Sequence, residues 1–313
     1  MHSTITSGFA RTATMAFTAC MALNSCIFDY PGPCPEDALV VEYDWAAVPE
    51  AEVEGMGLLL YPTGGGRYWR YDLPQPGGKA GIIDDSYNVV TFNNDTEAAV
   101  FENDGSYTTL RVTTREGQLS DGMGTYGVAV PPRGSTEPET VYRQPDMIWA
   151  DTARNLTLTN TDTITMHPRP VVARYTVIVD HIENLESAAD CSMSVSGLSS
   201  GYVFASASRT AERATVPGSL TKKASDTVQG VLHTFGKPEP GNENVLSVYF
   251  LIRNGEKKAF LFDVANVIDA AEDPMNVVIH VGGISLPYTA PDEGTGMDVG
   301  VDNWDIVDIE LST

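Results

Sequence analysis

Basic residues are scarce in this chain: it has 19 Lys and Arg against 42 Asp and Glu, and its formal net charge at pH 7 is −23. No Lys or Arg follows Lys258, whereas acidic residues continue as far as Glu310. Nucleic acids bind proteins mainly through cationic side chains, so a chain this acidic excludes nucleic acid as a partner. We interpret the acidic C-terminal part as a solvated surface that resists aggregation.

Cysteine is also rare, with only Cys20, Cys26, Cys34 and Cys191 in the chain. These four and the isolated histidines show none of the spacings of a zinc site, and the acidic tail lacks EF-hand spacing, so we expect no metal and no cofactor. Cys34 and Cys191 are a candidate disulfide if the chain is exported to an oxidising compartment. A disulfide needs the two Cα atoms within about 7 Å of each other, so two free thiols are the alternative.

A hydrophobic run long enough to cross a membrane, about 18 to 20 residues, is missing from the sequence. The short apolar run from Met15 to Leu23 follows Arg11 and leads into Leu23-Asn24-Ser25-Cys26. An aliphatic residue, a small residue and a cysteine in this order are typical of the end of a bacterial lipoprotein signal. We therefore predict that residues 1–25 are a signal peptide and that acyl chains on Cys26 tether the mature chain to a membrane. An ordinary secretory signal, cut elsewhere, is the alternative.

Helical periodicity is nearly missing as well, since only residues 264–271, followed by Pro274, favour a short helix. Most of the chain consists of short segments in which apolar and polar residues alternate, such as 39–45 and 171–179. Such alternation is typical of strands with one buried face. Asn254-Gly255 lies between two apolar runs and predicts a hairpin with a type I′ turn. The chain is therefore predicted to be all-β, with two tandem antiparallel β-sandwiches and Greek-key connections.

The length of the mature chain suits two domains. We predict a lipidated spacer at 26–37, an N-terminal β-sandwich at 38–167 and a C-terminal β-sandwich at 168–313. The boundary lies at His167-Pro168-Arg169-Pro170, because two prolines interrupt the strand pattern there. Residues 115–146 are rich in Gly, Pro, Ser and Thr and are interpreted as a long surface excursion.

Two motifs suggest catalysis or nucleotide binding, and their contexts argue against both. Residues 197–201 (GLSSG) match the nucleophile elbow of hydrolases, but residues 202–205 favour a strand where the elbow requires a helix. Residues 122–127 (GMGTYG) match a dinucleotide-binding loop, and again no helix follows. We therefore predict binding without catalysis, and an esterase built on Ser199 is a third hypothesis that Ser199→Ala tests.

The tryptophans offer a second kind of candidate site. Trp45, Trp69, Trp149 and Trp304 are the aromatic side chains that would form a sugar-stacking platform. Three of them lie within strand patterns, where an aromatic side chain normally packs in the core, so we predict core positions for them.

Four stretches carry a family resemblance that spans nearly the whole mature chain. They are the LNSC stretch with Cys34-Pro35 after it, residues 40–45 with 55–62, residues 87–93 (YNVVTFN), and residues 297–299 leading to 304–307. With these features the chain resembles the fimbrillin-like surface lipoproteins of Bacteroidota, and among them an uncharacterised branch that is similar to fimbrial anchor and accessory subunits.

The resemblance implies transthyretin-like sandwiches, lipid anchoring in the outer membrane at the cell surface, and binding to other fimbrial subunits by donor-strand exchange. In the family's stalk subunits a trypsin-like protease removes the first strand, and Arg67 and Arg70 are the candidate processing positions here. An anchor-like subunit would keep its first strand. The expected function is that of a fimbrial anchor or accessory subunit in adhesion or fimbria assembly. The alternative is a glycan-binding surface lipoprotein of a nutrient-uptake system.

Overall fold

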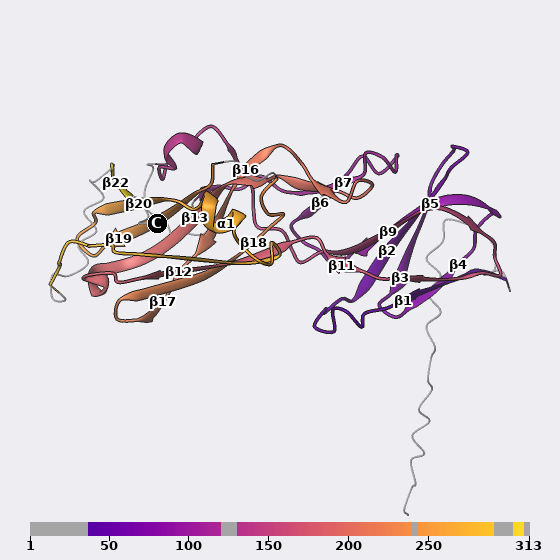
Figure 1. Ribbon diagram of the computed structural model, residues 1–313, viewed down its shortest axis with the longest axis horizontal. Coiled ribbons are helices and arrows are strands. Elements are labelled where there is room, and N and C mark those ends of the chain that lie inside the picture. The colour runs from indigo at the N-terminus through magenta and orange to yellow at the C-terminus, as the bar shows by residue number, and fades with distance from the viewer. Residues whose placement is uncertain (1–36, 120–129, 239–242, 291–302, 310–313) are drawn as a thin grey trace, which may run out of the picture.

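The computed structural model describes residues 37–119, 130–238, 243–290 and 303–309. These residues form an elongated molecule with one group of sheets at each end (Figure 1). The described part is almost entirely β-structure, which confirms the predicted fold class. None of its helices is long and apolar enough to span a membrane.

The first sandwich packs a five-stranded sheet, in the order β11-β9-β5-β2-β3, against a three-stranded sheet, β10-β1-β4. Its core contains the fully buried side chains of Leu39, Met56 and Leu58, with Trp45, Trp69 and Trp149 packed against it as predicted. The strands are β1 (Leu39–Tyr43), β2 (Gly55–Pro62), β3 (Trp69–Pro74), β4 (Gly77–Ala80), β5 (Asp85–Asn93), β9 (Trp149–Leu158), β10 (Thr163–Met166) and β11 (Arg169–Pro170).

The second sandwich packs the sheet β17-β18-β12-β21 against the six-stranded sheet β22-β20-β19-β13-β16-β8. Its core includes Val177, Phe250 and Phe262, and the short helix α1 (Ala265–Asp269) lies near the predicted place. The strands are β8 (Thr140–Val141), β12 (Ala173–Asp180), β13 (Ala188–Ser199), β16 (Arg213–Ser219), β17 (Thr221–Ala224), β18 (Thr227–Thr234), β19 (Val245–Ile252), β20 (Lys257–Asp263), β21 (Asn276–Gly282) and β22 (Trp304–Ile309).

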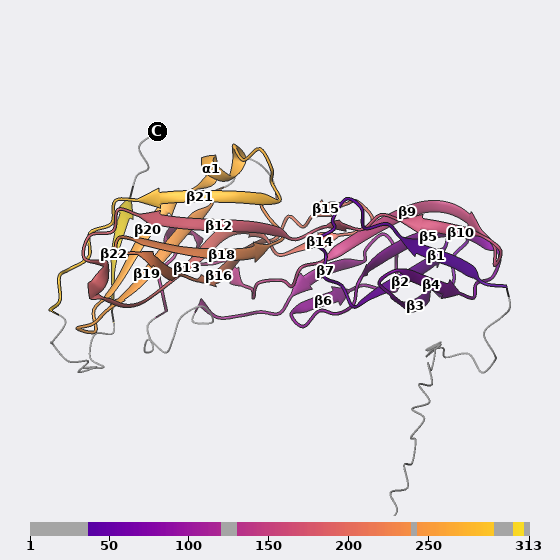
Figure 2. The same cartoon turned by 90° about the horizontal axis from the view of Figure 1, so that it is seen from below.

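A small third sheet joins the two sandwiches. It has the order β15-β14-β7-β6 and consists of β6 (Ala99–Glu102), β7 (Arg111–Thr114), β14 (Gly201–Val203) and β15 (Ser208–Arg209). β7 pairs with β14, so strands from the two halves of the chain share hydrogen bonds. Phe101 of β6 stacks on Phe92, with ring centroids 4.0 Å apart, and also on Phe204, which is tilted against Phe92. Figure 2 shows these strands between the two sandwiches.

Residues 130–143, which we name the crossing segment, lie along the second sandwich and end beside the joining sheet, where the Arg143 N–H donates to Arg115 O at 2.9 Å. The segment contains the 3-10 helix η2 (Gly134–Thr136) and β8, which pairs in parallel with β16. The predicted surface excursion is therefore not a free loop over this stretch, because Arg133 and Thr136 are buried. By its contacts the crossing segment belongs to the second sandwich.

Two details of the predicted strand pattern differ in the structure. The sandwiches were predicted to be antiparallel, but four strand pairs are parallel: β1 with β10, β12 with β21, β8 with β16 and β20 with β22. The Asn254-Gly255 hairpin joins β19 to β20 as predicted, but its type I′ turn is wrong, because Gly255 has a positive φ of 91° and Asn254 does not. The Gly255 N–H donates to Ile252 O and the Ile252 N–H donates to Glu256 O. This is a three-residue loop in which only the last position needs a glycine-like conformation.

Candidate functional site

The first strand and its two neighbours form the candidate site that the family resemblance singles out, and we name this arrangement the first-strand site. β1 lies between β10, to which it is parallel, and β4, to which it is antiparallel. The side chains of Leu39, Val41 and Tyr43 point into the core and are 0%, 1% and 7% exposed. β1 thus uses both of its edges and one of its faces, and its removal would open a groove between β10 and β4.

Gly77 determines how closely β4 approaches β1. A Cβ atom at this position would lie 2.0 Å from Val41 O, and Gly77 has a φ of +115°. No side chain fits that distance, and L-residues rarely adopt that backbone conformation. Just beyond β1, the indole N–H of Trp45 donates to Gln75 O at 3.0 Å and fixes the chain to the loop between β3 and β4.

The Tyr43 hydroxyl connects β1 to the opposite sheet. It lies 3.0 Å from the hydroxyl of Thr91 on β5, which in turn donates to Gly57 O on β2 at 2.9 Å. Burial raises the pKa of Tyr43 to about 12, so the phenol is neutral at physiological pH. A neutral buried hydroxyl with a partner keeps the two sheets in register without a buried charge.

Asp44 fixes the end of β1 to the segment after β10. Its N–H donates to Met166 O at 2.9 Å, and its carboxylate lies 3.2 Å from His167 Nδ1. A hydrogen bond from the Ala46 N–H lowers the pKa of Asp44, with the nearby His167 as a smaller contribution. At the other end of β1 the Val40 N–H donates to Asp162 O at 2.9 Å, so both ends of the first-strand site are held by hydrogen bonds.

The two predicted processing positions are accessible but lie beyond two buried strands. Arg67 is exposed in the loop between β2 and β3. Arg70 is exposed on β3, with its guanidinium 3.3 Å from the Asp72 carboxylate. Cleavage after either arginine would separate both β1 and β2 from the rest of the chain. Because β2 is an inner strand with Leu58 and Leu60 fully buried, such cleavage would remove much of the first core.

The predicted lipid and disulfide positions are largely outside the described residues. Cys26 and Cys34 precede residue 37, where the description begins. Cys191 is a free thiol on β13, 5% exposed in the second core, with its Sγ 3.6 Å from Leu220 O. Burial raises the pKa of its thiol to about 11, which disfavours the reactive thiolate. Its pairing with Cys34 stays a prediction.

The serine of the hydrolase-like motif, Ser199, is the last residue of a strand and is followed by another strand, not by the helix that the elbow requires. β13 ends at Ser199 and β14 begins at Gly201. The Ser199 hydroxyl is 2% exposed and bonds to Gly201 O and Thr210 O at 2.8 Å each. A hydrolase would need a histidine beside this serine, but the imidazole Nε2 of His280 lies 2.5 Å from the Asp180 carboxylate. Within the described ranges no three His, Cys, Asp or Glu side chains are arranged to hold a metal ion.

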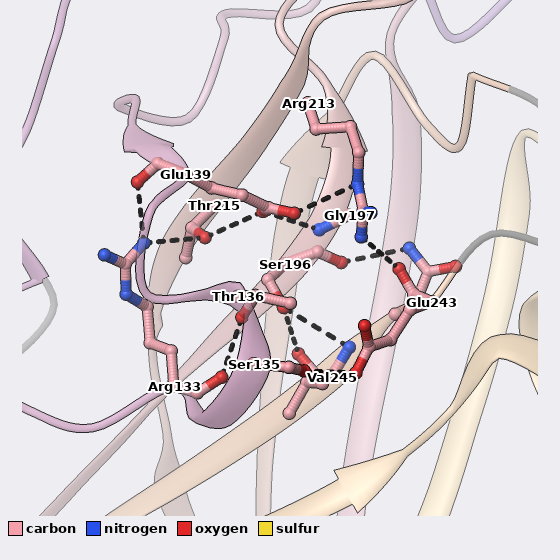
Figure 3. Close-up of polar contacts among 11 residues, drawn as sticks. Arg133, Ser135, Thr136, Glu139, Ser196, Gly197, Arg213, Thr215, Glu243 and Val245 are labelled. Atoms are coloured by element: carbon pink, nitrogen blue, oxygen red, sulfur yellow. Dashed lines mark hydrogen bonds and ion pairs between the residues drawn. The ribbon is translucent and has the colours of Figure 1, made fainter.

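Sequence reasoning missed a buried polar cluster at the crossing segment (Figure 3). The Arg133 guanidinium, 6% exposed, donates to Glu139 O at 2.9 Å and to Glu137 O at 2.5 Å. The Glu139 carboxylate lies 3.0 Å from Arg213 Nε and accepts from the Gly197 N–H at 2.9 Å. Pro131, Pro132 and Gly134 favour a loop, and no periodicity marks Arg133 as buried. The cluster attaches the crossing segment to the second sandwich.

Comparison with protein families places the chain. Residues 25–218 match the model of the family described as Domain of unknown function (DUF5119). The chain belongs to this family. A search of curated proteins found no match to this DUF5119 chain.

Solved structures from Bacteroides share its fold. A candidate adhesin of Bacteroides ovatus ATCC 8483 superposes with a TM-score of 0.65 at 20% identity, over 82% of this chain and 94% of that one. A candidate polysaccharide-binding protein of Bacteroides thetaiotaomicron superposes with a TM-score of 0.50 at 10% identity, over 80% of this chain and 92% of that one. The fimbrial anchor protein Mfa2 of Porphyromonas gingivalis superposes with a TM-score of 0.48 at 14% identity, over 78% of this chain and 90% of that one. At these identities the adhesin and the polysaccharide-binding protein show a shared fold, in agreement with the predicted tandem β-sandwiches.

Proposed function

We propose that this protein is a lipoprotein of the cell surface, held in the outer membrane by acyl chains on Cys26. In this proposal it acts as a fimbrial anchor or accessory subunit that contributes to adhesion or fimbria assembly by binding other subunits. Its support is the adhesin-like fold together with the lipoprotein signal in the sequence. The role is binding and not catalysis.

The position of β1 is the observation that supports an anchor or accessory subunit over a stalk subunit. A stalk subunit of the resembled family must lose its first strand, and here that strand contributes three buried side chains and two strand pairings. Burial of each large apolar side chain contributes about 1.5–3 kcal/mol. A protein that keeps β1 retains this stability and remains continuous with its lipid anchor.

Contacts with other subunits would use strand pairing, in which an extended segment joins a sheet edge. β22 supports such a role. It pairs only with β20, and it leaves Ile306 and Val307 50% and 38% exposed on opposite faces. Ile309 is partly buried against the second core and Trp304 packs against Tyr249, but the other four side chains of β22 are exposed. An edge strand that buries so little surface is available for exchange with a neighbouring subunit.

The decisive experiment is the intact mass and the N-terminal peptide of the protein purified from its native membrane. We expect an acylated Cys26 followed by the uncut chain, and the Cys26→Ala variant should lose membrane attachment. A chain that begins after Arg67 or Arg70 would instead indicate a polymerising stalk subunit. The variants Arg67→Gln and Arg70→Gln then show which bond is cut. A non-acylated start elsewhere would refute the lipoprotein proposal itself.

Glycan binding is the second candidate function. The observation that favours it is Tyr288, the one aromatic side chain among the strongly exposed hydrophobic residues of the described ranges, at 67% exposure. Exposed aromatic rings provide a stacking surface for sugars. A glycan array probed with the mature chain and with the Tyr288→Ala variant tests this role. Glycan binding predicts that the mature chain binds at least one glycan and that the variant loses this signal. The absence of any glycan signal would leave the fimbrial role as the proposal.

A further inference from the structure

The free edge of β21 differs from the other sheet edges of the molecule. β21 is the last strand of the sheet β17-β18-β12-β21, and its seven residues include no Lys, Arg, Asp, Glu or Pro. Figure 2 shows it along the rim of the second sandwich. Proteins usually protect an edge strand with charges or proline, because an unprotected edge pairs with other strands. β21 lacks this protection.

The other edge strands of the described residues are either protected or short. Charged residues or proline occur in all of the longer ones except β21: Arg70, Asp72 and Pro74 in β3, and Asp305 and Asp308 in β22. The remaining edge strands, β4, β6, β8, β10, β11, β15 and β17, have two to four residues each. A long uncharged edge is thus found in β21 alone within this part of the chain.

The pairing with β12 shows which backbone groups of β21 face outward. At one end of the parallel ladder the Arg174 N–H donates to Met275 O at 2.7 Å, and at the other the Gly283 N–H donates to Asp180 O at 3.3 Å. In a parallel pair the bonding residues alternate along each strand. The residues that bond to β12 are therefore Val277, Ile279 and Val281.

It follows that the N–H and C=O groups of Val278 and His280 point away from the sheet. No residue in the described ranges forms a backbone hydrogen bond with them. The Val278 side chain is 57% exposed on the outer face, whereas Ile279 between them is fully buried in the core. An added strand could form hydrogen bonds with the N–H and C=O groups of Val278 and His280 and would lie beside the core of the second sandwich.

Charges at both ends of β21 restrict the partner. The exposed Glu272 and Asp273 precede the strand, and Asp180 and Glu183 lie at its far end. Arg174, a basic residue of this face, is on β12 and thus one strand away from the edge. His280 and His181 contact the Asp180 carboxylate at 2.5 and 2.8 Å, so the far end also holds two imidazoles beside its acidic groups. A second copy paired antiparallel through β21 would place acidic ends against acidic ends, in a chain whose net charge is −23. Repulsion disfavours that pairing and favours a partner with basic ends.

We propose that the free edge of β21 accepts an extended segment of another protein, apolar in its centre and basic at both ends, as an additional strand. The site is separate from the first-strand site and does not depend on a fimbrial role. Backbone hydrogen bonds to Val278 and His280 would supply affinity, and the acidic ends would select the partner.

Two labelled peptides test the proposal on the intact mature chain by fluorescence anisotropy. One has alternating Val and Thr between pairs of lysines, and the other has glutamates in place of the lysines. We expect saturable binding of the lysine-ended peptide and at least tenfold weaker binding of the other. Val278→Pro removes an outward N–H without breaking the ladder to β12, so it should weaken binding at least tenfold. Val278→Ala keeps the N–H and should bind as the parent does.

Amide hydrogen exchange of the unmodified protein gives a readout that does not depend on the folding of the proline variant. The amides of Val278 and His280 should exchange rapidly in the free protein and become protected when the lysine-ended peptide is added. Protection at another edge, equal binding of both peptides, or equal binding by Val278→Pro and Val278→Ala would overturn the proposal. So would a dimer that Val278→Pro dissociates, because it would make a second copy the occupant.

Discussion

At the scale of single residues, Gly77 has the greatest effect on the first-strand site. Gly77→Ala would place a methyl group against Val41 O and force alanine into a left-handed conformation. We expect it to lower the free energy of unfolding by about 2 to 4 kcal/mol. Urea denaturation measures the change. Gly64→Ala is the matched control, since a Cβ there meets no atom within 4 Å, and an equal loss in both variants would contradict the argument.

Tyr43 makes the stability of the first sandwich depend on alkaline pH. The unfolded chain loses the phenol proton near pH 10, whereas the folded chain retains it up to about pH 12. The stabilisation is therefore complete below pH 10 and is lost as the pH rises toward 12. A shift of two pKa units corresponds to about 2 to 3 kcal/mol.

The test is urea denaturation at pH 9 and at pH 11.5 for the parent protein and for Tyr43→Phe. The parent should lose more stability between the two pH values than the variant does. Tyr71 and Tyr175, whose pKa values burial also raises to about 12, contribute equally to both proteins and cancel in the comparison. Identical losses would show that the Tyr43 hydroxyl is not desolvated.

At the scale of strands, β1 and β22 are held in opposite ways. β1 pairs on both edges and buries one face, whereas β22 pairs on one edge and exposes most of its side chains. We expect the amides of β22 to exchange with solvent at least a hundredfold faster than those of β1, because local opening costs least where little surface is buried. Hydrogen exchange with mass spectrometry measures both strands together. Comparable protection would remove β22 as an exchangeable strand.

The strand pattern was predictable to the extent that it is local. The alternation at 39–45 and 171–179 predicted β1 and β12, and the apolar runs beside Asn254-Gly255 predicted the hairpin. The type of turn was not predictable from the dipeptide alone, since the register of β19 and β20 adds a third residue to the loop. The free edge of β21 could not be predicted either, because alternation shows which face of a strand is buried but not which strand lies beside it.

At the scale of the whole molecule, the joining sheet and the crossing segment couple the two sandwiches. We expect calorimetry to show a single unfolding transition for the parent protein. Gly201→Val should split it into two, because a Cβ at this position would lie 2.4 Å from Val112 O and would separate β14 from β7. Gly105→Ala, where a Cβ meets nothing within 4 Å, should leave the single transition intact. Two transitions in the parent would mean that the halves unfold independently.

The sequence by itself determined the all-β class, the short helix and the positions of many strands, because these depend on periodicity and turn residues within a few positions of one another. The acidic composition also follows from the sequence, and lipid attachment at Cys26 stays a prediction from it. Only the tertiary structure decided that β1 lies between β10 and β4, that β7 pairs with β14, and that Arg133 of the crossing segment is buried. Each of these arrangements joins residues that are far apart in the chain. Their partners are selected by packing and hydrogen bonding in the folded molecule, which no local pattern specifies.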